Sequence, residues 1–456
     1  MIVMTVADAA AAVGGQVHGD ATVQVTAPAT LDSRDVQPGG LFAALDGEHV
    51  DGHDFAAQAL GAGASAVLAS RPVDEPCIVV DDVTVALAQL ATHLLGLIDP
   101  VVIAITGSQG KTSAKDLLAA VLEPSGPTIA PVGSFNNELG VPLTVLRADQ
   151  ATRYLVVEMG ARGVGHVASL CRIAPPDVAV VLNVGRAHVG EFGSPDVTAR
   201  AKGEIVEALS ADGTAVLNAD DARVAAMASR TSARVLTFGE TGDVVLGDVR
   251  LDDDGEPLFT LSHAGVTVDV HVPQIGAHHA SNAAAAATTA LALGLDLDVV
   301  ADRLDQAVAR SPMRMARHVR DDGLVVIDDA YNANPESMAA ALHALASVGS
   351  ARSSASGGGD RTVAVLGEML ELGDRSHAAH VEVGRLAAEL GVDRVVAVGA
   401  GAAGIAEGAG ERGTAVADVD EAVRELSAWL TPADVVLVKA SRGVRLERVT
   451  EALLGG

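Results

Sequence analysis

Runs of β-branched and other apolar residues alternate with helix-compatible stretches through most of the chain. The apolar runs predict strands at 101–105, 154–158, 178–182, 215–217, 324–328, 362–366, 394–398 and 434–438. Strands that are separated in this way by helices favour mainly parallel sheets with helices on their faces. The pattern therefore predicts an α/β protein.

Two breaks divide this pattern into three expected domains. They lie at Asp99-Pro100 and near Ser311-Pro312, because the residue before a proline is displaced from the helical conformation. We expect a small α/β N-terminal domain over 1–98 and a central P-loop-type domain with a mainly parallel sheet over 99–311. A Rossmann-like, doubly wound C-terminal domain is expected over 312–456.

Two further stretches have an unusual composition. Residues 275–295 carry no charge but contain two histidines, so they are too weakly apolar for a membrane span and predict a buried helix. The Ser- and Gly-rich stretch 351–359 is interpreted as a flexible loop inside the third domain. The first residues lack the basic region of a signal peptide. We expect a cytoplasmic protein without stable membrane insertion.

A glycine-containing turn follows the first strand of the expected central domain. Glycine lets successive backbone N–H groups point at phosphate oxygens, and the start of the next helix adds partial positive charge. Lys111 would reach the β- and γ-phosphates, and the Thr112 hydroxyl would bind Mg²⁺. Ile105 stands where a standard P-loop has its first glycine, so this loop is shorter than in most ATPases. The predicted phosphate-binding residues are Gly107, Ser108, Gln109, Gly110, Lys111, Thr112 and Ser113.

Three residues further along are candidates for metal binding or catalysis. Glu158 ends a predicted strand, which is where an open α/β sheet places its ligands, and His188 follows the next one. Lys202 is one of only four lysines, and a lysine amine can be carboxylated by CO₂. The alternatives are a structural carboxylate, a packing or surface histidine, and a solvated helix lysine.

The charge balance excludes some classes of partner. The chain has 456 residues, with 59 Asp and Glu against 31 Lys and Arg, and a formal net charge of −28. Such an acidic surface repels nucleic-acid phosphates and anionic lipids, and nine aromatic residues are few for base stacking. We therefore expect no nucleic-acid partner. Cys77 and Cys171 lie too far apart in sequence to form a CxxC metal site.

Taken together, these motifs resemble the Mur ligase family, the ATP-dependent amide-forming enzymes of peptidoglycan precursor synthesis. The resemblance covers essentially the whole chain, and the short phosphate loop is typical of that family. It rests on 107–113, Glu158, His188, Lys202-Gly203-Glu204 and 276–282. The family usually has asparagine where this chain has His279.

Within the family, three stretches resemble the member that joins D-alanyl-D-alanine to a UDP-N-acetylmuramoyl-tripeptide through an acyl phosphate. They are 136–144, 328–335 and 366–373. A sister ligase that adds the diamino acid is similar at 32–34 and 51–55, but it would carry a DNPR-like stretch that is not found in this sequence. That sister, a folylpolyglutamate-type ligase and, more remotely, a P-loop hydrolase or switch are the alternatives.

The resemblance implies a role for each matching residue on the nucleotide side. Lys111 and Thr112 would hold the triphosphate and one Mg²⁺, and Glu158 and His188 would also bind metal. Lys202 would be carbamylated and would orient a second Mg²⁺. The remaining expected ATP contacts are Asn282 to adenine, and Arg314 and Asp329 to the phosphates and ribose.

The resemblance also implies contacts to the other two substrates. The pocket for the UDP end would contain Asp32, Ser33 and Arg34. The other expected substrate-binding residues are Asn136, Asn137, Asn332, Asn334, Ser441 and Arg442, the last four on the dipeptide side. The stretch 332–335 has an alternative interpretation, since asparagine followed by proline is also a common way to begin a helix.

Overall fold

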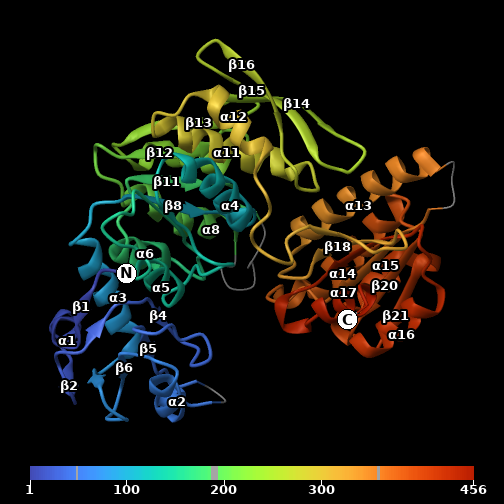
Figure 1. Ribbon diagram of the computed structural model, residues 1–456. Helices are drawn as coiled ribbons and strands as arrows, with labels where there is room; N and C mark the ends of the chain where they lie inside the picture. The colour runs from blue at the N-terminus through green and yellow to red at the C-terminus, as the bar shows by residue number, and fades with distance from the viewer. Residues whose placement is uncertain (48–49, 186–193, 357–359, 456) are drawn as a thin grey trace.

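The computed structural model describes residues 1–456 except 48–49, 186–193, 357–359 and 456. Three α/β bodies follow one another along the chain: the N-terminal and C-terminal parts lie on either side of the lower half of the molecule, and the central part lies above them (Figure 1). Each is built around its own sheet. The expected α/β class with three domains is confirmed, while the boundaries at 98/99 and 311/312 remain predictions.

The N-terminal part contains a five-stranded sheet of order β2-β7-β6-β5-β4, parallel except for the β2–β7 pair. A two-stranded ribbon, β1–β3, lies beside it. The apolar faces of α3 (Val83–Leu95) and of α5 (Gly140–Val145) in the central part belong to one continuous core, which joins the two parts. The elements are β1 Met4–Thr5, α1 Val6–Val13, β2 Gln16–His18, β3 Gln24–Val25, β4 Ala29–Thr30, β5 Leu41–Ala43, α2 Ala56–Gly61, β6 Ala66–Ala69, β7 Cys77–Val79 and α3 Val83–Leu95.

The central part contains a nine-stranded sheet of order β16-β15-β14-β13-β12-β11-β8-β10-β9. Strands β8 to β14 pair in parallel, and β8, β10 and β11 are almost entirely apolar and buried, as expected for strands covered on both faces. Strands β15 and β16 form an antiparallel edge. The strands are β8 Val101–Thr106, β9 Thr128–Ile129, β10 Tyr154–Glu158, β11 Val178–Val181, β12 Thr214–Asn218, β13 Arg234–Gly239, β14 Val244–Leu251, β15 Pro257–His263 and β16 Val266–His271. The helices are α4 Lys111–Leu122, α5 Gly140–Val145, α6 His166–Ile173, α8 Pro195–Lys202, α9 Glu204–Glu207, α10 Ala222–Ala225, α11 His278–Ala292 and α12 Leu297–Asp305.

The C-terminal part contains a six-stranded sheet of order β17-β18-β22-β19-β20-β21, parallel except for β17. Helices α13, α14 and α15 cover one face, and α16 and α17 cover the other. This is a doubly wound domain, as predicted. Its elements are β17 Ala316–Val319, β18 Val325–Asp329, α13 Pro335–Ser356, β19 Thr362–Gly367, α14 Ser376–Glu389, β20 Arg394–Val398, α15 Ala403–Ala409, β21 Gly413–Val416, α16 Val419–Trp429, β22 Val435–Lys439 and α17 Glu447–Leu453.

The interpretation of 351–359 as a loop is wrong for its first six residues. Residues 351–356 form the last turns of α13, and the Arg352 guanidinium donates to the Gly323 carbonyl oxygen at 3.2 Å. Alanine and arginine are strong helix formers, and serine costs only about 0.5 kcal/mol relative to alanine, so this composition does not end a helix. The expected buried helix within 275–295 is confirmed as α11.

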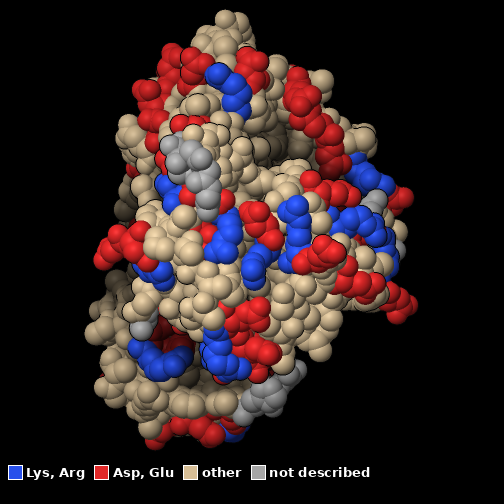
Figure 2. All heavy atoms as spheres, turned by 90° about the vertical axis from the view of Figure 1, so that its right-hand side faces the viewer, with Lys and Arg blue, Asp and Glu red and all other residues tan. Residues whose placement is uncertain are grey.

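Acidic and basic side chains are interspersed on the face that the C-terminal part presents (Figure 2). Lys and Arg occur there in small groups between Asp and Glu, and not as the continuous basic stripe that binds a nucleic-acid backbone. Within the described ranges, no helix combines the length and the apolar character needed to cross a bilayer.

Candidate active site

The phosphate loop lies between β8 and α4, in the parallel part of the nine-stranded sheet, where β8 is flanked by β11 and β10. Gly110 has a φ of +80° and immediately precedes the first residue of α4, Lys111. A Cβ atom at Gly110 would lie 2.4 Å from the Asn282 Oδ1 atom, so only glycine fits this turn. The Lys111 ammonium donates to the Gly107 carbonyl oxygen at 2.7 Å, which folds the side chain back over the loop.

A residue that the sequence analysis missed holds this loop in place. The backbone N–H groups of Ser108 and Gln109 donate to the Asn183 Oδ1 atom at 3.0 and 3.1 Å. Gly185 N–H donates to the Ser108 hydroxyl at 2.9 Å. Asn183 directly follows the predicted strand 178–182, so its position at a strand end could have identified it from the sequence as a site residue.

Glu158 lies beside the loop because β10 pairs in parallel with β8, with Glu158 level with Ile105. The carboxylate is completely buried, and its Oε2 atom accepts hydrogen bonds from the hydroxyls of Thr112 at 3.2 Å and Ser134 at 3.5 Å. Its Oε1 atom has no partner among the described residues. Burial raises the pKa of Glu158, although the nearby cations Lys115, Lys111 and Arg314 oppose this shift. A buried carboxylate with a free oxygen is a strong candidate for a metal ligand.

Two lysines bring buried amines to the same place. Lys202, the last residue of α8, is 2% exposed, and burial lowers its pKa well below the usual value. Burial also lowers the pKa of Lys111, which Glu158 partly restores. His188 lies outside the described residues, so the structure does not place it.

The C-terminal part supplies the opposite wall. The Arg314 Nη2 atom donates to the Thr112 hydroxyl at 3.3 Å, and its guanidinium lies over the Tyr331 ring, 4.1 Å from the ring centroid. Asp329 pairs with the buried Lys439 at 2.5 Å. The Arg314 Nε atom is buried without a partner among the described residues. A guanidinium with an unpaired N–H that faces the phosphate loop is suited to bind an anion.

These residues line one cavity of about 660 Å³ between the central and C-terminal parts. Of the predicted site residues, the structure brings together Ser108, Gln109, Gly110, Lys111, Thr112, Ser113, Asn136, Asn137, Lys202, Asn282, Arg314, Asp329, Asn332 and Asn334 along its wall. Gly107 and Glu158 lie directly behind them, bonded to Lys111 and Thr112.

A smaller cavity of about 220 Å³ opens beside the first. It is lined by Ser441 and Arg442 together with Asn332 and Asn334, so the four candidates for the dipeptide side do lie together. Asn334 also begins α13, because its Oδ1 atom accepts the Ser337 N–H at 2.8 Å and the Ser337 hydroxyl accepts the Asn334 N–H at 3.0 Å. The helix-start interpretation is thus confirmed for Asn334, which lines the cavity as well.

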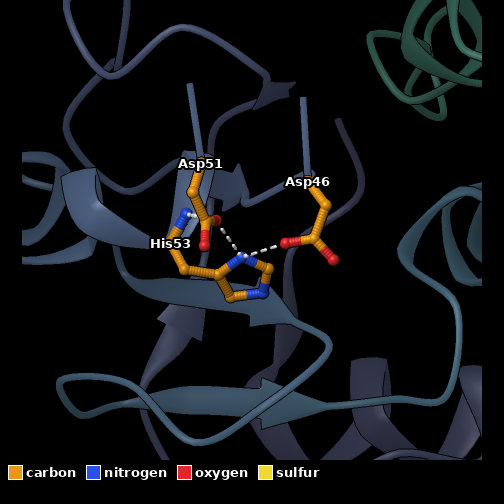
Figure 3. A group of neighbouring side chains, drawn as sticks. All are labelled: Asp46, Asp51 and His53. Atoms are coloured by element: carbon orange, nitrogen blue, oxygen red, sulfur yellow. Dashed lines mark hydrogen bonds and ion pairs between the residues drawn. The ribbon is translucent and has the colours of Figure 1, made fainter. Parts of the chain in front are cut away.

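The three residues predicted to bind the UDP end lie in the N-terminal part, and none of them lines either of these two cavities. Asp32 is half-buried and bonds its neighbour Arg34, whose guanidinium lowers the pKa of Asp32 to about 2; Ser33 is buried. In the stretch 51–55, the His53 Nε2 atom accepts the Ser70 N–H at 3.0 Å. Its Nδ1 atom lies 2.7 Å from an Asp51 carboxylate oxygen (Figure 3). Because both ring nitrogens are engaged, His53 fixes this turn and has no lone pair free for a metal.

The structure shows what His279 does, at a position where the resemblance leads us to expect asparagine. It is buried on α11, and both ring nitrogens lack partners among the described residues. Burial lowers its pKa well below the usual value, so the ring is neutral and packs against His278 with centroids 4.2 Å apart. His279 is therefore a packing residue, while His278 lines the cavity.

Several cavity residues were not predicted individually. Glu138, Tyr331 and Glu371 lie in the three stretches that carried the resemblance, so those motifs were the signal. Arg162 and His166 follow the strand that ends at Glu158 and could have been found as strand-end residues.

Comparison with known proteins agrees with this geometry. A family model described as the Mur ligase middle domain matches residues 105–290, and one described as Mur ligase, glutamate ligase domain matches 313–442. A third, described as Mur ligase family, catalytic domain, matches 29–95. The chain belongs to the Mur ligase family. The expected family is confirmed.

This Mur ligase has close relatives. It is 46% identical to the UDP-N-acetylmuramoyl-tripeptide–D-alanyl-D-alanine ligase of Mycobacterium tuberculosis, over 100% of this chain and 98% of that protein. The Escherichia coli protein of the same name is 36% identical, over 99% of each. The crystal structure of MurF from Acinetobacter baumannii superposes with a TM-score of 0.87 at 32% identity, over 100% of both chains. The MurF ligase from Thermotoga maritima in complex with ADP gives 0.78 at 31% identity, over 94% of this chain and 97% of that one.

Proposed function

We propose that this Mur ligase uses ATP to join D-alanyl-D-alanine to a UDP-N-acetylmuramoyl-tripeptide. The observation that carries the proposal is the cavity in which Lys111 and Thr112 face Arg314 across two domains, above the buried Glu158. The relatives named for this reaction, which match over their whole length, support it. We place the reaction in the cytoplasm, where ATP and UDP-linked precursors occur.

ATP binds with its triphosphate on the loop 107–113. The backbone N–H groups at the start of α4 and the Lys111 ammonium compensate its charge, and Arg314 approaches from the other domain. Asn282, which lies against Gly110, is proposed to contact adenine, and Asp329 to contact the ribose. The Thermotoga maritima relative in complex with ADP supports nucleotide binding by this fold.

The residues beside the loop fit Mg²⁺. Carboxylate and hydroxyl oxygens are the ligands that Mg²⁺ prefers, and Glu158 has a buried oxygen without a partner among the described residues next to the Thr112 hydroxyl. Glu158 and Thr112, with His188, are proposed to hold two Mg²⁺ ions, which neutralise charge on the triphosphate when bound.

Lys202 is proposed to complete this set as a carbamate. Burial lowers the pKa of Lys202 well below its usual value, which favours the neutral amine, and a neutral amine adds to CO₂ with loss of one proton. The product replaces a buried cation with a carboxylate that can orient a second Mg²⁺. This assignment explains why a lysine is buried at the cavity wall.

The reaction requires a phosphoryl transfer followed by an acyl transfer, both in the larger cavity. An oxygen of the tripeptide's terminal carboxylate attacks the γ-phosphorus, which releases ADP and leaves an acyl phosphate. The amine of D-alanyl-D-alanine then attacks the acyl carbon, loses a proton and expels phosphate, which carries the former carboxylate oxygen away. Lys111 and Arg314 stabilise charge on the transferred group, and the enclosed cavity limits hydrolysis by water.

The other substrates approach from two sides. Asp32, Ser33 and Arg34 are proposed to bind the UDP end in the N-terminal part, and Asn136 and Asn137 the peptide as it enters the larger cavity. The dipeptide is assigned to the smaller cavity, where Arg442 offers a cation for its carboxylate. The residues of that cavity proposed to bind it are Asn332, Asn334, Ser441 and Arg442.

A phosphate-release assay with different acceptor amines tests this function. With ATP and the tripeptide substrate present, D-alanyl-D-alanine should accelerate phosphate release, whereas diaminopimelate, lysine and glutamate should not. Acceleration by a single amino acid would favour a sister ligase. Equal release without any amine would favour a hydrolase.

A further inference from the structure

Three of the four lysines line the larger cavity; the fourth, Lys115, does not, and apart from its charge near Glu158 it has no place in the proposed chemistry. It lies on α4 one turn after Lys111 and is only 2% exposed. A charged amine in the middle of a buried helix is costly unless its donors are satisfied, so the partners of Lys115 show what it does.

Those partners connect α4 to the end of the central part. The Lys115 ammonium pairs with Asp116 at 2.5 Å and donates to the Pro131 carbonyl oxygen at 2.9 Å and the Ser311 hydroxyl at 3.3 Å. The Asp116 Oδ2 atom accepts the Ser311 backbone N–H at 3.1 Å. Lys115, Asp116 and Ser311 are all buried. Together they form a clasp in which both side chains of the ion pair bind one linker residue.

The chain beyond Ser311 runs directly into the site. Met313 and Met315 have φ values of +56° and +53°, a conformation that costs a residue other than glycine free energy and persists only where its surroundings enforce it. Tyr331 N–H donates to the Met313 carbonyl oxygen, and Met315 N–H donates to Asp329. Between these two residues, Arg314 reaches the Thr112 hydroxyl. The segment 311–315 is therefore fixed at one end by the clasp and at the other by β18.

We propose that Lys115 and Asp116 are positioning residues for the ligase reaction: by fixing Ser311 to the helix that begins at the phosphate loop, they hold Arg314 against that loop. Hydrogen bonds to a buried ion pair are directional, so they set the path of the linker more tightly than apolar contacts would. The same helix, α4, thereby sets the positions of both the nucleotide-binding loop and the Arg314 guanidinium from the other domain.

Double-mutant kinetics test the clasp. Lys115→Met and Asp116→Asn are made in the wild-type chain and in an Arg314→Ala background, and phosphate release is measured with ATP, tripeptide and D-alanyl-D-alanine. In the wild-type background we expect kcat to fall by about tenfold to a hundredfold, while the KM for tripeptide changes by less than about twofold. With Arg314 already removed, the same substitutions should change kcat by less than about twofold. Arg310→Ala, which removes an exposed ion pair to Glu123 from the same linker, is the matched control and should leave kcat unchanged.

Equal losses in both backgrounds would overturn the proposal, because the clasp would then act independently of Arg314. If a single variant does not fold, the Lys115→Met/Asp116→Asn double variant takes its place, because it removes both charges and keeps an amide oxygen that can accept the Ser311 N–H. A wild-type kcat in that double variant would also overturn the proposal. Because the inference rests on the proposed function, hydrogen exchange supplies a readout without catalysis. The amides of Ser311 and of residues 313–315 should exchange faster in Asp116→Asn than in wild type, and unchanged exchange would contradict the clasp even if no ligase activity were found.

Discussion

Replacing Gly110 with alanine should separate the role of the phosphate loop from general stability. The left-handed conformation of Gly110 costs any other residue about 1–2 kcal/mol, so the free energy of unfolding should fall by that amount. The new Cβ would also lie 2.4 Å from the Asn282 Oδ1 atom, where 3.4 Å is an ordinary contact, so the loop and Asn282 must separate by about 1 Å. This displacement should cost the bound nucleotide one well-aligned hydrogen bond to the protein. Such a bond is worth about 1.4 kcal/mol, so its loss would raise the Kd for ADP about tenfold.

Isothermal titration with ADP and denaturant unfolding measure the two effects on the same samples. Gly14→Ala is the matched control, since Gly14 ends α1 with a φ of +63° and a Cβ added there would have no neighbour within 4 Å. It should lose similar stability and keep the wild-type Kd. Wild-type ADP affinity in a folded Gly110→Ala variant would refute the assignment of this loop to the nucleotide. A weakened Kd in Gly14→Ala would show that the effect is not local.

Three other outcomes follow from the buried groups. Lys202→Ala should abolish activity, and near-normal turnover of this variant would contradict the carbamate. In the wild-type enzyme, activity that is lost in CO₂-depleted buffer should return when bicarbonate is added. Glu158→Gln should lower kcat at least a hundredfold in the presence of Mg²⁺. Thermal stability should be kept or raised, because burial already disfavours the charged form of this carboxyl and raises its pKa. An unchanged kcat would contradict metal binding by Glu158. Partial burial lowers the pKa of His271, but hydrogen bonds to Asp305 and Glu256 outweigh it and raise the pKa overall. His271→Gln should therefore lower the free energy of unfolding most below pH 6.5. The difference between variant and wild type should shrink as pH rises through the pKa that His271 has in the folded wild-type protein. A difference that does not change with pH would contradict this account.

The centre of the fold could be predicted because local signals agreed there. Strand 101–105, the glycine turn and the following helix all pointed to a phosphate loop, and the apolar strand ending at Glu158 pointed to the same sheet edge. Parallel pairing of β10 with β8 then brings the carboxylate to the loop. The order of strands and the side on which each helix packs depended on contacts distant in sequence.

The antiparallel edge of the central sheet was not predicted. Strands β14 to β16 alternate exposed and buried positions only in part, and β14 contains an irregularity between Gly247 and Arg250 that interrupts the two-residue period. Arg314 and Asp329 were assigned to the site from family resemblance, because no local pattern shows that residues after Ser311 return to the phosphate loop. Lys115 was overlooked for the same reason: its partners Pro131 and Ser311 are distant in sequence.

Oxygen transfer from the tripeptide tests the central claim most directly. The terminal carboxylate is labelled with ¹⁸O, the enzyme turns over ATP and D-alanyl-D-alanine in unlabelled water, and the released phosphate is analysed by mass spectrometry. Because phosphate departs with the former carboxylate oxygen, each phosphate should carry one ¹⁸O, and its release should require the dipeptide. Unlabelled phosphate, formed with or without the amine, would show that water and not the tripeptide carboxylate attacks ATP in this cavity.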